Sequence, residues 1–272
     1  MADLFEQDRT SFEDVDRAER SDTFAGYLTR MASDLADTKR RLHDLLAVEP
    51  GDTVLDVGCG TGADVRALSE RVGPTGRVIG VDNSRVLIEE ARAQSAGHIL
   101  PVDFRDGDAE DLPFEAEQFD AVRSERVLMH LNDPDRGLRE LIRVAKPGAR
   151  ILVADPDHGM WALDNPDAEV TRRLFTWWFG FIANPWIARG MPARFRTLGL
   201  RDVRVTMLPV MLYDLDAANA MTGVGKAAEA GARAGVLTEA ERFAFDRELT
   251  ARDEDGRFFM CGAILATTGV RP

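Results

Sequence analysis

The residues with the clearest chemical meaning lie in one short segment, 54–62, which reads VLDVGCGTG. An apolar run ends there in Gly58, Gly60 and Gly62, and a helical pattern follows directly. Glycine lets a backbone turn sharply and approach a ligand closely, and a helix start offers unpaired N–H groups at the positive end of its dipole. The segment therefore predicts a binding turn for a cofactor that contains a nucleoside. Cys59 fits this turn as a small residue, with no evident base beside it.

The acidic residues around the turn distinguish between two cofactors. Residues 58–63 match the dinucleotide fingerprint in its Gly/Ala form, and Asp82 lies where a carboxylate would hold the ribose of NAD. Asp56, however, ends the strand before the turn, where a carboxylate disfavours a pyrophosphate and favours a cation. S-adenosylmethionine carries an ammonium and a sulfonium and no phosphate, and Asp108 in a second acidic loop suits an adenine amino group. We therefore favour S-adenosylmethionine, and an NAD-dependent oxidoreductase is the alternative.

Five blocks of sequence occur in a specific order. They are VLDVGCGTG at 54–62, VIGVDNS at 78–84, GDAEDLPF at 107–114, FDAVRSERVLMHL at 119–131 and RVAKPGARILVAD at 143–155. Together they resemble the class I S-adenosylmethionine-dependent methyltransferases, in particular the type 11 branch of small-molecule methyltransferases. Ala149 departs from the family, which often has a second glycine there. The resemblance implies direct in-line methyl transfer that leaves S-adenosylhomocysteine. A protein that keeps the cofactor but runs another reaction, such as a cyclisation, is a further alternative.

The resemblance also implies which residues bind the cofactor. They are Asp56, Gly58, Cys59, Gly60, Gly62, Asp82, Asn83, Asp108, Ala109 and Ser124. Asp82 would accept both ribose hydroxyls, because a carboxylate has two acceptor oxygens. Asp108 would read the adenine edge, and Ser124 would face the methionine end from the tip of its strand. Simpler roles stay open for two of them, since Asp82 could cap a helix and Asp108 could shape a turn.

The candidate catalytic residues are two histidines that follow predicted strands. His130 and His158 come after the fourth and fifth strands, and ligands of parallel sheets bind at the carboxyl ends of strands. Either imidazole could act as a general base, and members of the resembled family have a functional histidine at the position of His130. The alternative is that His130 only packs or caps. Glu125 and Arg126 point into the same neighbourhood, where Arg126 could bind an anionic group of the substrate.

Two further segments are expected to surround the substrate. An aromatic stretch contains Trp177, Trp178 and Phe181, which either pack a helical cap or line an apolar pocket for an aromatic or terpenoid-like acceptor. The first 30 residues are expected to close over the cofactor as a lid, with Tyr27 and Arg30 near the methionine end. We interpret the basic run 39–41 as a solvent-exposed helix face.

The elements that must position these residues alternate along the chain. Strands are predicted at 53–57, 77–81, 99–105, 119–124 and 150–154, with helices at 64–72, 86–94 and 134–144 and a turn at 146–148. This alternation indicates an α/β fold with a mostly parallel sheet that is covered on both faces. Helical character is expected at 23–48, 161–198 and 217–252, and strands at 200–212 and 258–267. The prediction is a Rossmann-like, seven-stranded sheet with helical lid and cap insertions.

The predicted organisation is a single domain with three parts. Residues 1–48 would form a helical lid, residues 49–157 the cofactor-binding core, and residues 158–272 a substrate cap with the last strands.

Composition excludes several classes of function. The chain has 272 residues and a net charge of −13, which disfavours nucleic acid or an anionic membrane as partner. Its two cysteines form no CxxC pair, so we expect no metal site. With no signal peptide and no apolar run long enough to cross a bilayer, we expect a cytoplasmic enzyme with a small-molecule substrate. Whether it forms a homodimer is left open.

Overall fold

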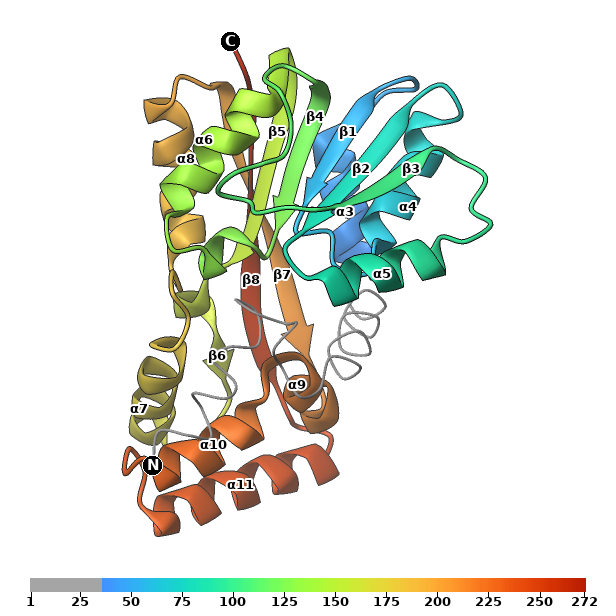
Figure 1. Cartoon of the computed structure of the whole chain (residues 1–272). Helices are drawn as coiled ribbons and strands as arrows, with labels where there is room; N and C mark the ends of the chain where they lie inside the picture. The colour runs from blue at the N-terminus through green and yellow to red at the C-terminus, as the bar shows by residue number, and fades with distance from the viewer. Residues whose placement is uncertain (1–35) are drawn as a thin grey trace.

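One mixed β-sheet forms the centre of the molecule in the computed structural model, which describes residues 36–272 (Figure 1). Its strand order is β3-β2-β1-β4-β5-β8, with β7 on the other edge of β8. The parallel strands are β1 (Thr53–Val57), β2 (Arg77–Asp82), β3 (Val102–Asp106), β4 (Phe119–Glu125) and β5 (Ala145–Pro156). The antiparallel strands are β7 (Arg201–Leu212) and β8 (Met260–Val270). This arrangement confirms the predicted Rossmann-like fold class.

The sheet differs from the prediction in two details. It has eight strands within the described residues, because the two-residue β6 (Ala162–Leu163) continues the line of β5 along the edge of β8. The turn expected at 146–148 was wrong, since these residues belong to β5. The irregularity that the sequence signalled is a shift of register between β4 and β5, with Gly148 at a φ of 82°.

Helices cover both faces of the sheet. The helices α3 (Ala36–Leu46), α4 (Ala63–Val72) and α5 (Arg85–Gln94) pack on one face. The helices α6 (Pro134–Val144) and α8 (Ile187–Thr197) pack on the other, next to the short helix η2 (Leu128–His130). α6 begins as its sequence dictates, because Asp133 accepts a hydrogen bond from the Arg136 N–H and Pro134 occupies the first turn.

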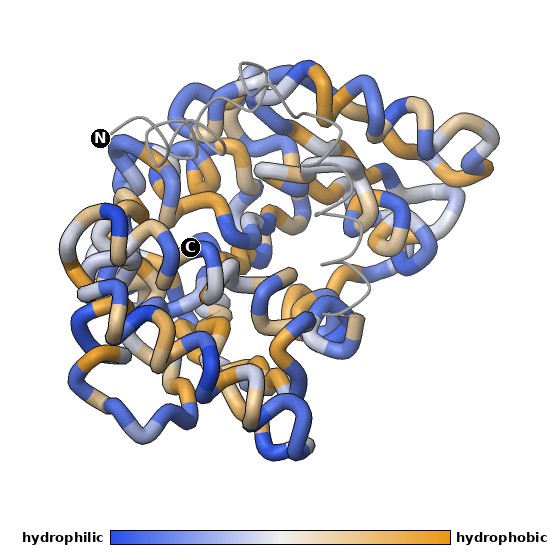
Figure 2. The backbone as a smooth tube through the Cα atoms, turned by 90° about the horizontal axis from the view of Figure 1, so that it is seen from below, coloured by the Kyte–Doolittle hydropathy of each residue, from blue (hydrophilic) through white to orange (hydrophobic). Residues whose placement is uncertain are grey.

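A helical cap lies beyond the carboxyl ends of the parallel strands, in the lower part of Figure 1. It contains α7 (Ala168–Phe179), α9 (Leu215–Thr222), α10 (Val224–Arg233) and α11 (Glu239–Glu254), and η3 (His158–Met160) leads into it. The helical region expected at 161–198 is therefore divided into β6, α7 and α8. Hydrophobic and hydrophilic residues are interspersed along the whole backbone, as expected where each element buries only one side (Figure 2).

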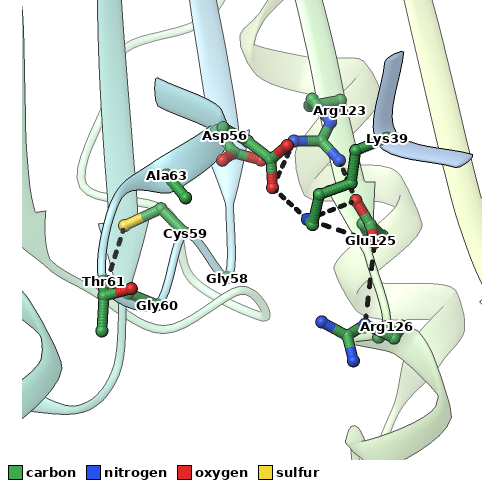
Figure 3. A pocket seen from close by; sticks show the side chains of 11 residues that line it. Lys39, Asp56, Gly58, Cys59, Gly60, Thr61, Ala63, Arg123, Glu125 and Arg126 are labelled. Atoms are coloured by element: carbon green, nitrogen blue, oxygen red, sulfur yellow. Dashed lines mark hydrogen bonds and ion pairs between the residues drawn. The ribbon is translucent and has the colours of Figure 1, made fainter. Parts of the chain in front are cut away.

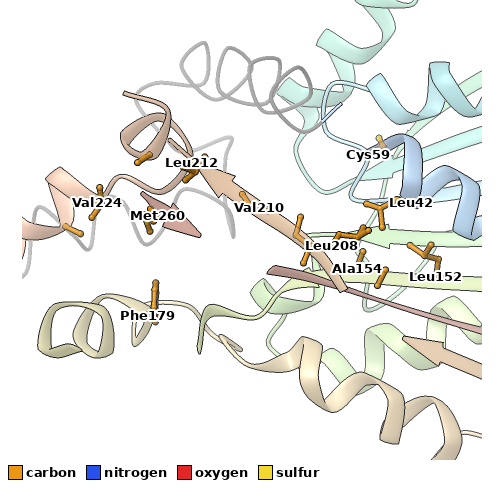
Figure 4. Close-up of a cluster of buried hydrophobic side chains, with 14 of the residues drawn as sticks. Leu42, Cys59, Leu152, Ala154, Phe179, Leu208, Val210, Leu212, Val224 and Met260 are labelled. Atoms are coloured by element: carbon orange, nitrogen blue, oxygen red, sulfur yellow. The ribbon is translucent and has the colours of Figure 1, made fainter. Parts of the chain in front are cut away.

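The cap and the sheet share one hydrophobic core. A single cluster of buried side chains begins at Leu42 of α3 and continues through Leu208 and Val210 of β7 (Figure 4). It then reaches Met260 of β8 and Val224 of α10. Because β7 and β8 run from the sheet into the cap, we interpret the molecule as one folding unit with a cap at one end.

Two glycines at helix ends allow a test of how tightly the cofactor-side core is packed. Gly62 before α4 and Gly223 after α9 share the left-handed backbone conformation, with φ and ψ of 77° and 17° and of 70° and 26°. A Cβ atom at Gly62 would lie 2.5 Å from Cε1 of Phe104, whereas one at Gly223 would meet no described atom within 4 Å. We expect Gly223→Ala to lower the free energy of unfolding by about 1 kcal/mol through backbone strain. Gly62→Ala should cost about 1–3 kcal/mol more through overpacking. Urea titrations followed by circular dichroism measure both, and equal losses would contradict the packing argument.

Candidate functional site

The glycine turn folds back onto the end of β2. Gly58, Gly60 and Gly62 all have positive φ values, of 75°, 52° and 77°. The Gly58 and Cys59 N–H groups donate to the Val81 carbonyl at 2.7 and 3.0 Å, and the Gly60 N–H donates to Asp82 Oδ2 at 2.8 Å. Burial, followed by the charges of Asp82 and Asp56, raises the pKa of the Cys59 thiol. These facts agree with Cys59 as a small turn residue and not a nucleophile.

The acidic residues predicted to bind the nucleoside lie along one edge of the sheet. Asp82 ends β2, and its Oδ1 accepts from the Ser84 N–H at 3.0 Å. Ser84, not Asp82, caps α5 by accepting from the Leu87 N–H. The alternative of Asp82 as the cap is therefore wrong, and the two oxygens of a carboxylate at this strand end suit the two hydroxyls of a diol. Its register partner on β3 is Asp106.

The adenine-side residues follow β3 in a turn. Asp108 is exposed and its Oδ1 accepts from the Glu110 N–H at 2.8 Å, so it does shape the turn. Ala109 beside it is half-buried, and Asn83 after β2 is exposed. The Gly107 N–H donates to the Asp82 carbonyl at 3.0 Å, which ties this turn to the end of β2. The structure thus brings the predicted ribose and adenine residues to one edge.

A buried arginine organises the methionine side of the pocket (Figure 3). Arg123 of β4 is 1% exposed, and its Nη1 lies 3.2 Å from Asp56 Oδ1 and 3.3 Å from Asp64 Oδ2. Its Nη2 pairs with Glu125 of the same strand. Three carboxylates, from β1, α4 and β4, therefore surround one guanidinium. We call Asp56, Asp64, Arg123 and Glu125, together with Lys39, the charge cluster.

Lys39 joins α3 to the charge cluster. Its Nζ lies 2.5 Å from Asp64 Oδ2 and 3.3 Å from Glu125 Oε2, and it lines the pocket with the glycine turn. His43, one turn further along α3, lies 2.8 Å from Asp64 through its Nε2. The interpretation of 39–41 as a solvent-exposed face was therefore wrong for Lys39, although Arg40 and Arg41 are exposed.

The alternation of side chains along β4 decides which of its predicted site residues reach the pocket. Side chains alternate along a strand, so Arg123 and Glu125 face the pocket and Ser124 faces the opposite side of the sheet. Ser124 is fully buried and does not line the pocket, so its predicted place at the methionine end was wrong. Glu125 and Arg126, predicted to meet the substrate, line the pocket beside the glycine turn, with Arg126 Nε 3.7 Å from Glu125 Oε1, and their contact with substrate stays a prediction.

One carboxyl of the charge cluster has a pKa close to neutral pH. Burial raises the pKa of Asp56 to about 7, although Arg123 opposes the rise. Burial acts in the same direction on Asp64 and Glu125, but the neighbouring cations Arg123 and Lys39 hold the pKa of both below its usual value. A ligand cation placed beside Asp56 would favour the ionised carboxylate there.

The two candidate histidines lie on the acceptor side, beyond the carboxyl ends of β4 and β5. Burial, the largest cause for both, lowers the pKa of His130 and of His158 to about 4. Both imidazoles are therefore neutral at pH 7. The His158 ring lies 5.2 Å from that of Phe179, at the end of α7, so it contacts the aromatic part of the cap.

The aromatic residues of the cap divide into two groups. Trp178 stacks on Phe179 with ring centroids 5.2 Å apart, which places it on the His158 side of α7. Trp177 packs instead against Gly231 of α10 and meets Phe181 edge to face at 4.9 Å. Trp177 and Phe181 therefore take part in the packing of the cap, and their contact with substrate stays a prediction. Tyr27 and Arg30 lie outside the described residues.

No group of histidine, cysteine or acidic side chains within residues 36–272 could hold a metal ion. No helix in the same range is long and apolar enough to cross a membrane.

Comparisons with known proteins agree with this geometry. Residues 48–179 match the family model described as a methyltransferase domain. An uncharacterised 37.1 kDa protein of a Streptomyces fradiae transposon is 34% identical over 216 residues, which cover 78% of this chain and 62% of that protein. A 2-phytyl-1,4-naphtoquinone methyltransferase of Synechococcus elongatus is 43% identical over 119 residues, covering 43% of this chain and 51% of the enzyme.

A solved structure shares the fold. It is the phosphoethanolamine N-methyltransferase 2 of Haemonchus contortus with bound S-adenosyl-L-methionine, at a TM-score of 0.62 and 16% identity. The match covers 96% of this chain and 60% of that one. Residues 48–179 therefore form a methyltransferase domain of the S-adenosylmethionine-dependent class, and the chain shares the fold of the solved structure. It spans 62% and 51% of the two sequence relatives, so what the whole protein acts on is a separate question.

The charge cluster predicts a strongly pH-dependent loss of stability in one variant. Removing the cation in Arg123→Leu leaves three carboxylates buried together, which should cost about 3–5 kcal/mol of unfolding free energy at pH 8. The cost should shrink towards pH 5, because Asp56 then becomes protonated and repels less. Arg77→Leu is the control, since Arg77 pairs with Asp103 at the surface and should cost less than about 1 kcal/mol. Chemical denaturation at both pH values measures the losses, and a pH-independent cost would contradict the prediction.

Proposed function

We propose that this chain transfers the methyl group of S-adenosylmethionine to a small-molecule acceptor. The observation that carries the proposal is the pocket beside the glycine turn, which is lined by both acids and bases. An amino-acid end with an ammonium and a carboxylate needs such a lining, whereas a pyrophosphate would meet the carboxylates of Asp56 and Glu125. The residues present therefore fit the cofactor that the family implies.

Individual residues have distinct roles in this proposal. Asp56 and Glu125 would hold the ammonium of the methionine part, and Lys39 and Arg126 would hold its carboxylate. Lys39 thus takes the role that the sequence suggested for Arg30. Asp82 would bind the ribose hydroxyls, with one oxygen already fixed by the Gly60 N–H. When bound, S-adenosylmethionine supplies a methyl group that its sulfonium makes electrophilic.

The acceptor would lie between the carboxyl edge of the sheet and the cap. The neutral imidazoles of His130 and His158 offer proton acceptors there, and the Trp178 and Phe179 side of α7 offers an apolar wall. Such a lining suits an aromatic or isoprenoid-bearing acceptor more than a charged one. The name of the naphthoquinone methyltransferase relative supports the same substrate class. The cap would exclude water, and orientation of this kind can be worth roughly 7–11 kcal/mol of barrier.

Cofactor choice can be tested without knowing the acceptor. Calorimetry with S-adenosylhomocysteine and with NAD should show binding of the first and none of the second. Asp82→Ala should weaken S-adenosylhomocysteine binding by about 1.5–3 kcal/mol, the scale of hydrogen bonds to a charged group. Asp106→Ala is the matched control, because Asp106 is the register partner of Asp82 and is exposed. Binding of NAD alone, or equal effects of the two variants, would overturn the proposal.

The acid side of the pH–rate profile tests whether an imidazole acts as the general base. With reduced 2-phytyl-1,4-naphthoquinone as acceptor and labelled S-adenosylmethionine, the ratio of the wild-type kcat/KM to that of His130→Asn should stay constant between pH 7 and about pH 5.5. The pKa of His130 is about 4, and Asp56, whose pKa is about 7, is common to both proteins. If His130 is the base, His130→Asn should lower kcat by about 10²–10⁴-fold. His98→Asn is the control, because His98 lies on the far loop against Ser69. A wild-type rate in His130→Asn would remove the base role.

A further inference from the structure

The turn 126–130, which follows β4 and contains η2, touches both halves of the proposed site. Val127 packs so closely on the glycine turn that a Cβ atom at Gly58 would lie 2.1 Å from its Cγ2. Arg126 lies beside Glu125 of the charge cluster, and His130 ends the turn on the acceptor side. The placement of this turn therefore fixes the imidazole relative to the cofactor turn.

The backbone of the turn is strained and held from two sides. Arg126 has a φ of 58°, which is unfavourable for a residue with a side chain. Its N–H donates to the Ala154 carbonyl of β5 at 2.8 Å. From the cap side, the Asn184 N–H donates to the Met129 carbonyl at 2.9 Å. Strain of this kind persists only where the surroundings enforce it, and it is common at functional sites.

Asp155, the residue after Ala154, lies buried beneath this turn. It is 0% exposed, and neither carboxylate oxygen makes a hydrogen bond of normal geometry with any described residue. The groups that stabilise its charge are the Met129 and Val127 backbone N–H groups and the Arg126 side chain, while Glu125 opposes it. On β8 its register partner is the uncharged Leu265. The polar groups with the largest effect on the Asp155 charge thus belong to the turn 126–130 or to Glu125 just before it.

A buried acid in such surroundings is costly, and the fold does not require it. Burial raises the pKa of Asp155 to about 7, so its charged form is costly at neutral pH. An apolar residue of similar size would avoid this cost. A buried polar group with weak local satisfaction calls for a functional explanation.

We propose that Asp155 is a positioning residue, which holds the turn 126–130 through the Val127 and Met129 N–H groups and so sets where His130 lies relative to Gly58. The importance of this placement for catalysis rests on the proposed function, whereas the placement itself is tested without it. Asp155 acts through the turn and need not touch the substrate.

The test uses histidine resonances of the full chain labelled with 13C-histidine, assigned by single substitutions of the four histidines. In the wild type, the His130 resonance should show an inflection near pH 7 as Asp155 titrates. Asp155→Asn should abolish this inflection and move the His130 resonance, while the His43 resonance on α3 stays in place. Asp56 also has a pKa of about 7, so the inflection is assigned to Asp155 only if it persists in Asp56→Asn, which keeps the test decisive even if Asp155→Asn folds poorly. An unmoved His130 resonance and no inflection would overturn the proposal.

A matched control separates positioning from a general loss of buried polarity. Thr267→Val removes another buried, unpartnered oxygen from the same sheet face, where Thr267 pairs with Val153 and not with the turn. It should leave the His130 resonance unchanged. If Thr267→Val moves it as much as Asp155→Asn does, the positioning role is wrong.

Kinetics connect the inference to the proposed function. With S-adenosylmethionine and the reduced naphthoquinone, Asp155→Asn should lower kcat about tenfold or more, and the KM for S-adenosylmethionine should change less. Calorimetry with S-adenosylhomocysteine distinguishes a failure of the proposed function from a failure of the positioning role. Absent binding in the wild type defeats the proposed function but leaves the His130 readout valid. Intact binding with unchanged kcat in Asp155→Asn defeats the positioning role.

Discussion

The ion pairs around Arg123 are the interaction on which the rest of the site depends. A guanidinium that is 1% exposed brings together carboxylates from β1, α4 and β4, which would otherwise repel one another in a medium of low dielectric. Lys39 then ties α3 to the same cluster. Buried ion pairs contribute little net stability compared with apolar packing, but breaking one is costly, so their geometry is strongly enforced. The cluster therefore fixes the helices that flank the cofactor turn more than it stabilises the fold.

A single strand connects this cluster to the acceptor side. Because side chains alternate along β4, Arg123 and Glu125 reach the pocket while Ser124 enters the core beneath α6 and α8. The strand then ends in the strained Arg126, and the chain turns into the short helix that carries His130. The two halves of the site are thus linked covalently over a few residues, which is why the support of this turn matters.

The sequence predicts those parts of the site whose signal is local. Glycines at fixed spacing after an apolar run locate the cofactor turn, and Asp56 and Asp82 are recognised by their places at strand ends. The charge cluster has no such signal, because Lys39, Asp64 and Arg123 are far apart in the chain and meet only in the fold. An arginine inside an apolar strand was the one available hint.

The acceptor side depends on the cap in a way that no local pattern reveals. Trp177 and Trp178 are neighbours in the sequence, yet the helical phase of α7 turns one towards α10 and the other towards Phe179. Phe179 in turn meets His158, so the same helix that completes the shared core also desolvates an imidazole. Because cap and sheet share one core, the low pKa of these histidines follows from the packing of the whole molecule. Changes in the cap should therefore alter which acceptor binds, while the cofactor end stays under the control of Arg123.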